Sequence, residues 1–476
     1  MPKIKKKTSQ GISFHRHFQP PTALQRKKAM GSFPCQSEAK ISREKMLQRC
    51  QQQRRSSVQE EGLETQNKND QECFINHGLA LSDLDDERLF IPTARSETSF
   101  ATPKPKDELD WLAQVPEEGQ TYEDYISFLV SRRGRMKPIA NAEGLDILLL
   151  PIIRSEAEPL KRKGNYSHHL QDWEGPSMEH LVQYTQVFFD RQVRVLPAAQ
   201  LSVSQPEDVT SSAKKRKTQL RESNKPGAFA SKSKFKLYLP QRDGALTAPV
   251  PIAGREDPTS DRIQLKVDSL LDELSSYRLS GKHDSHNNNN TKEFCIMAIT
   301  MIDLFDGPSD LFCAGMAFGG DKVAVFSFKR YHPLIKMHPL YWHNYGYAKT
   351  FDGYSYYEDD DQDPKGLSSH PSKISKELAI EFLRRSSKLL THELGHLYGF
   401  DHCIHNRCLM MGTGHLVEDF RAPSNLCGIC LRKLQFRTGC DIVERYKKLS
   451  DAFRKMGFVK EEVWTLKQHK HLKRIR

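Results

Sequence analysis

Hydrophobic positions along the chain follow two different spacings, and these predict a mixture of helices and strands. Apolar residues recur every three or four positions in some segments, which is typical of amphipathic helices, and form short unbroken runs in others, which is typical of buried strands. The predicted helices cover residues 121–133, 177–190, 262–277 and 372–399. The predicted strands cover residues 145–153, 191–197, 294–305, 311–320 and 322–331.

The order of these elements predicts the fold class. The strand, helix, strand unit from residue 145 to 197 indicates a crossover between two parallel strands. The strands at 311–320 and 322–331 meet at a short "GGD" turn, which predicts an antiparallel hairpin. We therefore expect an α+β fold in which a mixed sheet packs on the long helix that begins near residue 372.

Composition divides the chain into a folded part and polar segments. Only 37% of the 476 residues are hydrophobic, which is low for a chain folded throughout. The polar composition of residues 1–105 predicts a disordered basic extension, because so polar a segment buries too little apolar surface to offset chain entropy. The catalytic domain is expected over residues 106–466. It is interrupted by a flexible insert at about 201–260 and followed by a basic tail at 467–476.

Charge and cysteine content bear on location and partners. The net charge is +12, from 72 Lys and Arg against 60 Asp and Glu, but the basic runs lack interleaved aromatic residues and so do not favour nucleic-acid binding. The start of the chain has no apolar run typical of a secretion signal, and no segment suggests a membrane span. We expect an intracellular, cytoplasmic protein that is not secreted and is monomeric, with "KKRK" at 214–217 as a candidate nuclear import signal.

The segment "HELGHLYGFDHCIHNRCLMMG", residues 392–412, carries the candidate chemistry. His392 and His396 lie one helical turn apart, so both imidazoles leave the same face and can bind one zinc ion. Glu393 lies beside them, where its carboxylate could take a proton from a zinc-bound water. Gly399 can end the helix in a left-handed conformation and return His402 to the same ion. The spacing therefore predicts a catalytic zinc on His392, His396 and His402.

Four cysteines in the same region predict a second zinc. Cys403 and Cys408 form one pair, and Cys427 and Cys430 form a CxxC pair, which together are typical of a four-thiolate structural site. The alternative interpretation is a set of buried free cysteines. His405 and His415 are left over, and each is interpreted as a surface or packing residue rather than a ligand.

The run "HELGHLYGFDHCIHNRCLM…NLCGIC" resembles the archaemetzincins, a branch of the metzincin metallopeptidases. The resemblance implies a metzincin-like fold with a small zinc-stapled C-terminal helical part. It also implies two zinc ions, Glu393 as general base and acid, and Met410 as an apolar floor beneath the three histidines. The hairpin at 313–331 resembles the sheet edge along which metzincins bind an extended substrate.

These features predict a zinc metallopeptidase that hydrolyses peptides or proteins, with an aminopeptidase-like activity on short peptides as the family-level expectation. The acidic cluster at 358–361 is a candidate site for a substrate amine, although a solvated acidic loop is the better interpretation. Two alternatives stay open. One is a regulatory protein in which zinc only supports the fold, and the other is a nucleic-acid-associated factor.

Overall fold

The computed structural model describes residues 18–31, 101, 103–106, 110–130, 145–155, 172–203, 234–241, 245–256, 263–281, 292–308, 310–335 and 376–475. Two predicted features lie outside these residues, namely the acidic cluster at 358–361 and the basic run at 214–217. Among the helices that the structure describes, none is both long enough and apolar enough to cross a membrane.

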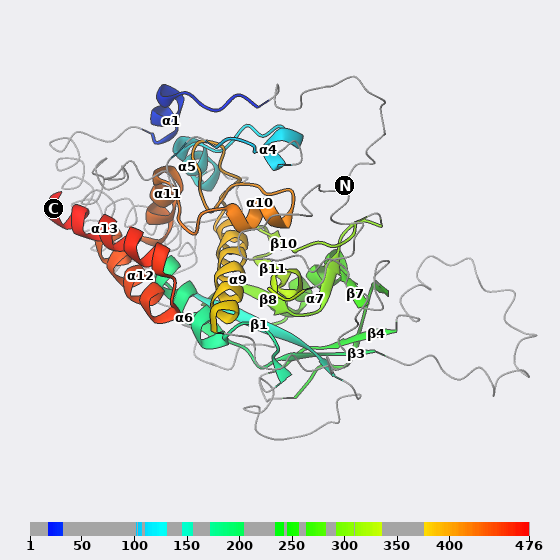
Figure 1. Ribbon diagram of the computed structural model, residues 1–476. Coiled ribbons are helices and arrows are strands. Elements are labelled where there is room, and N and C mark those ends of the chain that lie inside the picture. The colour runs from blue at the N-terminus through cyan, green and yellow to red at the C-terminus, as the bar shows by residue number, and fades with distance from the viewer. Residues whose placement is uncertain are drawn as a thin grey trace, which may run out of the picture.

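An eight-stranded mixed sheet forms the centre of the molecule (Figure 1). Its strand order is β10-β11-β8-β1-β3-β4-β5, and β2 also pairs with β1. Strand β1 is parallel to β2, β3 and β8, and β8 is parallel to β11, whereas β10, β4 and β5 run antiparallel to their neighbours. The bounds are β1 (Leu145–Ser155), β2 (Val193–Val195), β3 (Ala199–Val203), β4 (Phe235–Tyr238), β5 (Val250–Ile252), β8 (Lys292–Thr300), β10 (Gly315–Phe318) and β11 (Val323–Ser327).

A smaller sheet of three strands has the order β6-β7-β9, with bounds β6 (Gly254–Glu256), β7 (Ile263–Lys266) and β9 (Asp303–Phe305). Ten α-helices of the described residues surround the sheets, together with the short 3-10 helix η6 (Lys329–Tyr331). They are α1 (Ala23–Ala29), α4 (Trp111–Gln114), α5 (Tyr122–Val130), α6 (Met178–Phe189), α7 (Val267–Leu279), α9 (Lys376–Leu397), α10 (Leu416–Arg421), α11 (Gly428–Thr438), α12 (Ile442–Met456) and α13 (Val459–Ile475).

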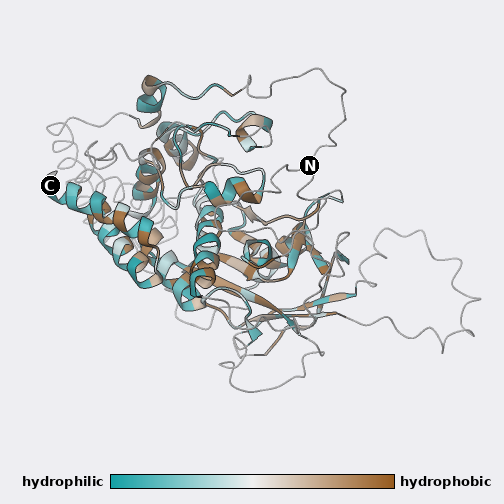
Figure 2. Ribbon diagram, in the orientation of Figure 1, coloured by the Kyte–Doolittle hydropathy of each residue, from teal (hydrophilic) through white to brown (hydrophobic). Residues whose placement is uncertain are grey.

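Both faces of the central sheet are buried, which explains why residues 147–153 of β1 are all apolar. Ile147 and Leu149 belong to one hydrophobic cluster, whereas Leu148 and Leu150 belong to the other. Successive side chains of a strand point to opposite faces, so a strand covered on both sides must be apolar throughout. Figure 2 shows the strands mostly in brown, while helices such as α12 carry both brown and teal.

The helices divide between these two faces. Buried residues of α6, α9, α11 and α12 lie in one cluster, and those of α7 lie in the other. Helix α9 also contacts β10 and β11, so it lies against the edge of the sheet (Figure 1). This arrangement positions the helix that carries the HExxH motif beside the edge strand.

Most predicted elements are confirmed, including the parallel β1 and β2 pair, the β10 and β11 hairpin and the long helix. Thr121 accepts a hydrogen bond from the backbone N–H of Asp124 at 3.0 Å, as a helix-capping residue does. The predicted helix 262–277 begins too early. Residues 263–266 form β7 instead, because Gln264 donates to the buried carboxylate of Asp303 on the neighbouring β9.

Three predicted polar segments need correction. The flexible insert at 201–260 contains β4, β5 and β6, and Phe235 and Leu237 alternate inward between lysines. The extension 1–105 contains α1, whose Ala29 is buried and whose Met30 carbonyl accepts from Arg432. The predicted basic tail 467–476 belongs to helix α13 as far as Ile475. Its Leu472 is buried, which helps to hold this part of the helix against the core.

Candidate metal centres

Helix α9 presents His392, Glu393 and His396 on its last two turns. His392 Nδ1 lies 2.8 Å from the backbone oxygen of Leu409, and His396 Nδ1 lies 2.7 Å from that of Phe400. A carbonyl oxygen only accepts hydrogen bonds, so each Nδ1 must carry the proton. Each neutral imidazole therefore presents the lone pair of its Nε2 atom to the site.

Gly399 brings the third predicted ligand to the same place. It adopts a left-handed backbone with φ of 93°, and its N–H donates to His396 O at 2.9 Å, which ends the helix as predicted. The His402 ring centroid then lies 5.5 Å from that of His392 and 5.0 Å from that of His396. The candidate ligand atoms of the three histidines all lie within 4.8 Å of one another.

The geometry of this histidine cluster fits a zinc ion. His392 Nε2 and His396 Nε2 lie 3.1 Å apart, and two lone pairs at this distance repel unless a cation lies between them. Two nitrogens bound tetrahedrally at about 2.0–2.1 Å would lie roughly 3.3–3.4 Å apart, close to the observed separation. Burial lowers the pKa of His392 well below its usual value and that of His396 to about 4. Both rings are thus held in the neutral form that a metal ligand requires.

Glu393 lies between the two α9 histidines in sequence and is only partly exposed. Burial raises the pKa of its carboxyl to about 7, and the nearby His402 opposes this shift. A carboxyl group that ionises near neutral pH is suited to take up and release a proton. A cation bound by the three histidines would favour its ionised form further.

Met410 packs against Gly395 of α9 and is completely buried. Its backbone oxygen accepts from the N–H of Cys403 at 2.7 Å, which ties the loop after His402 to the loop that holds the methionine. A side chain at Gly395 would approach Met410 Sδ to 2.5 Å, so the glycine is what allows the sulfur so close to α9. Met410 therefore lies against the helix that carries His392 and His396.

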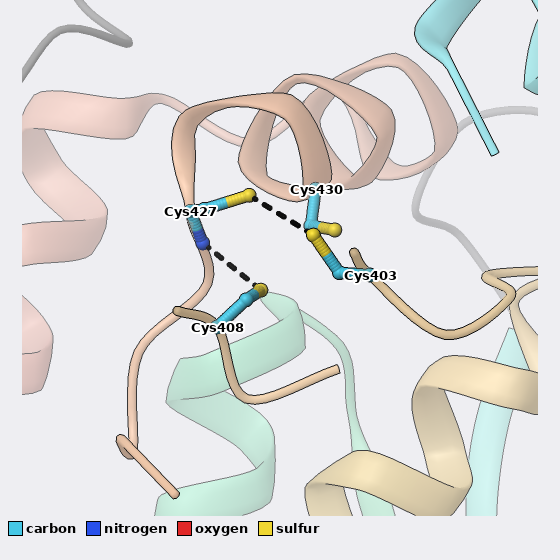
Figure 3. A group of neighbouring side chains, drawn as sticks. All are labelled: Cys403, Cys408, Cys427 and Cys430. Atoms are coloured by element: carbon cyan, nitrogen blue, oxygen red, sulfur yellow. Dashed lines mark hydrogen bonds between the residues drawn. The ribbon is translucent and has the colours of Figure 1, made fainter. Parts of the chain in front are cut away.

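The four predicted cysteines form a second cluster at the start of α11 (Figure 3). Cys403 and Cys408 reach it from the loop after α9, and Cys427 and Cys430 come from the first turn of α11 and the residue before it. Cys403 Sγ and Cys427 Sγ lie 3.7 Å apart, and all four residues are buried. Two thiolates of a tetrahedral zinc with bonds of about 2.3 Å would lie roughly 3.8 Å apart. The cluster has the donors and the spacing that a structural zinc needs.

One functional contact has no counterpart in the predicted site. Glu117, which lies 285 residues before His402, places Oε1 2.7 Å from His402 Nδ1. Trp111 Nε1 donates to the same oxygen at 2.6 Å. Nothing in the spacing of "DWLAQVPEEGQ" pointed to the histidines, since the contact depends on a fold that joins the two distant segments.

A third group of possible ligands, Asp110, His415 and Glu418, is already held together by hydrogen bonds. His415 Nε2 donates to Asp110 at 3.0 Å, and His415 Nδ1 accepts from the N–H of Glu418 at 3.2 Å. Arg421 also donates to Asp110, at 2.7 Å. His415 is thus a buried residue whose hydrogen bonds link the segment before α4 to α10. His405 is likewise buried.

The segment that carries both clusters is similar to a known peptidase family. The profile of Peptidase family M54 matches residues 372–436, which contain the three histidines and four cysteines. The expected resemblance to the archaemetzincins is confirmed. Archaemetzincin-2 of Macaca fascicularis is 43% identical over 162 residues, which cover 33% of this chain and 40% of that relative. Archaemetzincin-2 of Homo sapiens is 41% identical over 157 residues, with the same coverage.

More distant archaemetzincins match a larger share of the chain. Archaemetzincin-1 of Rattus norvegicus is 24% identical over 393 residues, which cover 79% of this chain and 60% of that relative. Among solved structures, a zinc-dependent peptidase from Methanocorpusculum labreanum aligns with a TM-score of 0.31 and 16% identity, covering 60% of this chain and 99% of that one. The archaemetzincin of Methanopyrus kandleri aligns with a TM-score of 0.27 and 17% identity, covering 64% and 97%.

Proposed function

We propose that this chain is a zinc metallopeptidase with a metzincin-like active site at the C-terminal end of α9. The convergence of His392, His396 and His402 supports the proposal most strongly, because candidate ligand nitrogens of the three rings lie within 4.8 Å of one another. Glu393 lies beside two of these histidines on the same helix. The similarity to archaemetzincins is consistent with it, although the chain spans only 40% of the archaemetzincin-2 relatives' length.

The chemistry follows from the positions of these groups. When bound, zinc would polarise the scissile carbonyl and lower the pKa of its water to about 7. Glu393 would take the proton of the attacking water and pass it to the leaving amine, as a general base and then a general acid. Burial raises the pKa of the Glu393 carboxyl to about 7, which suits both steps. Met410 would hold the histidines from below without taking part in the chemistry.

The edge strand β10 is the proposed binding surface for the substrate backbone. It ends the central sheet, pairs on one side with β11 and contacts α9, so this edge of the sheet lies close to the histidine-bearing helix. A peptide that adds to this edge as a further strand would pass the metal with its backbone extended. Aminopeptidase-like action on short peptides belongs to the same proposal. Blocking the amino terminus of such peptides should then slow their cleavage.

The cysteine cluster is the proposed site of a second zinc with a purely structural role. Its four thiols are buried, so a zinc there would be closed to water and to substrate. It would fasten the loop that carries His402 and Met410 to α11. The expected composition is therefore two zinc ions per chain, one for hydrolysis and one for folding.

A single substitution distinguishes the proposed peptidase from a regulatory protein in which zinc only supports the fold. Glu393→Gln removes the proton acceptor but keeps its shape and the three histidines. Elemental analysis should find two zinc ions in this variant, and a peptide library should reveal cleavage by the wild type but not by the variant. The matched control is Glu377→Gln on the exposed first turn of α9, which should cleave like the wild type. Equal cleavage by well-folded Glu393→Gln would contradict the proposed role.

A further inference from the structure

Residues 110–121, here called the strap, are hydrogen-bonded to the chain both before and after His402, the third histidine. At one end, Asp110 accepts from His415 and Arg421 of the α10 region. The backbone N–H of Trp111 donates to Glu418 at 2.8 Å. These bonds fix the start of the strap against the segment that follows the histidine cluster.

The other end of the strap is fixed to the residues just before His402 and to α11. Gln120 Nε2 donates to the backbone oxygen of Gly399 at 3.2 Å and to Asp401 at 3.1 Å. Lys433 of α11 donates to the backbone oxygen of Gln120 at 2.6 Å and to its side-chain oxygen at 2.8 Å. His402 therefore lies beneath a segment that is held at both ends by buried or half-buried hydrogen bonds.

The middle of the strap contacts His402 directly. Glu117 Oε1 lies 2.7 Å from His402 Nδ1, and the Trp111 ring meets the His402 ring edge to face at 5.7 Å. Gly412 leaves room for this packing, because a Cβ there would lie 2.3 Å from Trp111 and 2.9 Å from His402 Nδ1. The two α9 histidines use backbone oxygens for the equivalent contact, so His402 differs from them in having a carboxylate partner.

We propose that Glu117 is a positioning residue that holds His402 with Nε2 turned toward the zinc ion. A carboxylate at Nδ1 fixes the tautomer and the ring orientation, and it makes the imidazole a stronger donor to a metal. The second oxygen of Glu117 supports a role beyond packing. Oε2 is buried and has no hydrogen-bond partner among the described residues, whereas a purely structural carboxylate would be expected to use both oxygens.

This inference rests on the proposed function, since it assumes that the three histidines bind zinc. It assigns the strap a task in the metal site although the strap lies outside the matched residues 372–436. The N-terminal part of the folded chain would then be required for tight zinc binding, while supplying no ligand to the ion.

The test compares the full-length wild type with Glu117→Gln, which keeps the shape of the side chain but removes its charge. The matched control is Glu118→Gln, which changes the exposed neighbouring residue of the strap. Zinc affinity of the histidine site is measured by competition with a chelator, and elemental analysis and melting temperature report on the cysteine site and the fold. We expect zinc binding to weaken about 10–100-fold in Glu117→Gln alone, with the cysteine-bound zinc and the melting temperature unchanged.

Wild-type zinc affinity in folded Glu117→Gln would overturn the inference while leaving the proposed function intact. A separate variant, His396→Ala, tests whether the histidines bind zinc at all. If they do not, this variant should have the same zinc content as the wild type, and the proposed function would be wrong. If Glu117→Gln does not fold, Trp111→Phe tests the inference instead. This variant removes the N–H that orients Glu117 but keeps an aromatic ring beside His402. Several-fold weaker zinc binding supports the inference in that variant, and wild-type binding overturns it.

Discussion

Gly395 of α9 faces Met410 so closely that a Cβ atom at position 395 would lie 2.5 Å from the methionine Sδ and 2.9 Å from its Cε. The glycine lies between His392 and His396 along the helix, so the sulfur supports the helix at the level of the two ligands. A change at either residue should therefore affect both stability and the metal site.

Gly395→Ala should destabilise the protein, although alanine is the better helix former. The gain in helix propensity is about 1 kcal/mol, whereas overpacking a buried contact costs about 1–3 kcal/mol, and 2.5 Å is closer than real Cβ contacts come. Urea unfolding and zinc content measure the two effects. Gly307→Ala is the control, because its Cβ would meet nothing closer than 3.4 Å.

The double variant Gly395→Ala with Met410→Ala tests whether this contact is the cause. Removing the methionine side chain removes the clash, so the two changes together should destabilise less than the sum of the single changes. Strict additivity would show that the loss in Gly395→Ala arises elsewhere.

Cys427→Ser should remove one zinc ion and lower the free energy of unfolding by several kcal/mol, because structural zinc binding contributes directly to folding. The measurement is zinc content together with thermal unfolding. Cys440→Ser is the matched control, since Cys440 is equally buried but lies outside the cluster. Retention of two zinc ions and wild-type stability in Cys427→Ser would rule out the four-thiolate site.

The β3 and β4 hairpin should tolerate a much shorter connection. Val203 and Phe235 are direct partners in the antiparallel register, so a two-residue Asn-Gly turn can replace residues 204–234. We expect the shortened protein to fold, bind zinc and cleave peptides like the wild type. Loss of cleavage by a folded, zinc-loaded protein would show that the replaced segment takes part in the activity.

Glu418 should make stability depend on pH. Burial raises the pKa of its carboxyl to about 7, so the folded state favours the protonated form and loses stability as the pH rises from about 4.5 through 7. The effect is on the order of 2–3 kcal/mol. Urea unfolding at pH 5, 6, 7 and 8 should show the wild type losing stability relative to Glu418→Gln as the pH rises. A constant difference between the two proteins would contradict the assignment.

The sequence predicted which histidines and cysteines come together more accurately than it predicted the boundaries of the folded segments. The histidines and cysteines lie within 39 residues, residues 392–430, where helical periodicity and one glycine turn determine which side chains meet. Strand β4 was missed because Phe235 and Leu237 alternate with lysines in a segment whose composition resembles a linker. Glu117 was missed because its contact with His402 depends on the hydrogen bonds that hold Asp110 and Gln120, and sequence spacing carries no trace of these.

The most direct measurement of the central claim is the rate of peptide cleavage as zinc is returned to the histidine site. The histidines are partly exposed and the cysteines are buried, so a chelator should remove the histidine-bound zinc first. If the histidine-bound zinc carries out hydrolysis, cleavage should disappear with this first equivalent while the fold is retained, and it should recover fully when one equivalent of zinc per chain is added. Cleavage that persists after the histidine site has been emptied would show that this zinc is not the catalytic one.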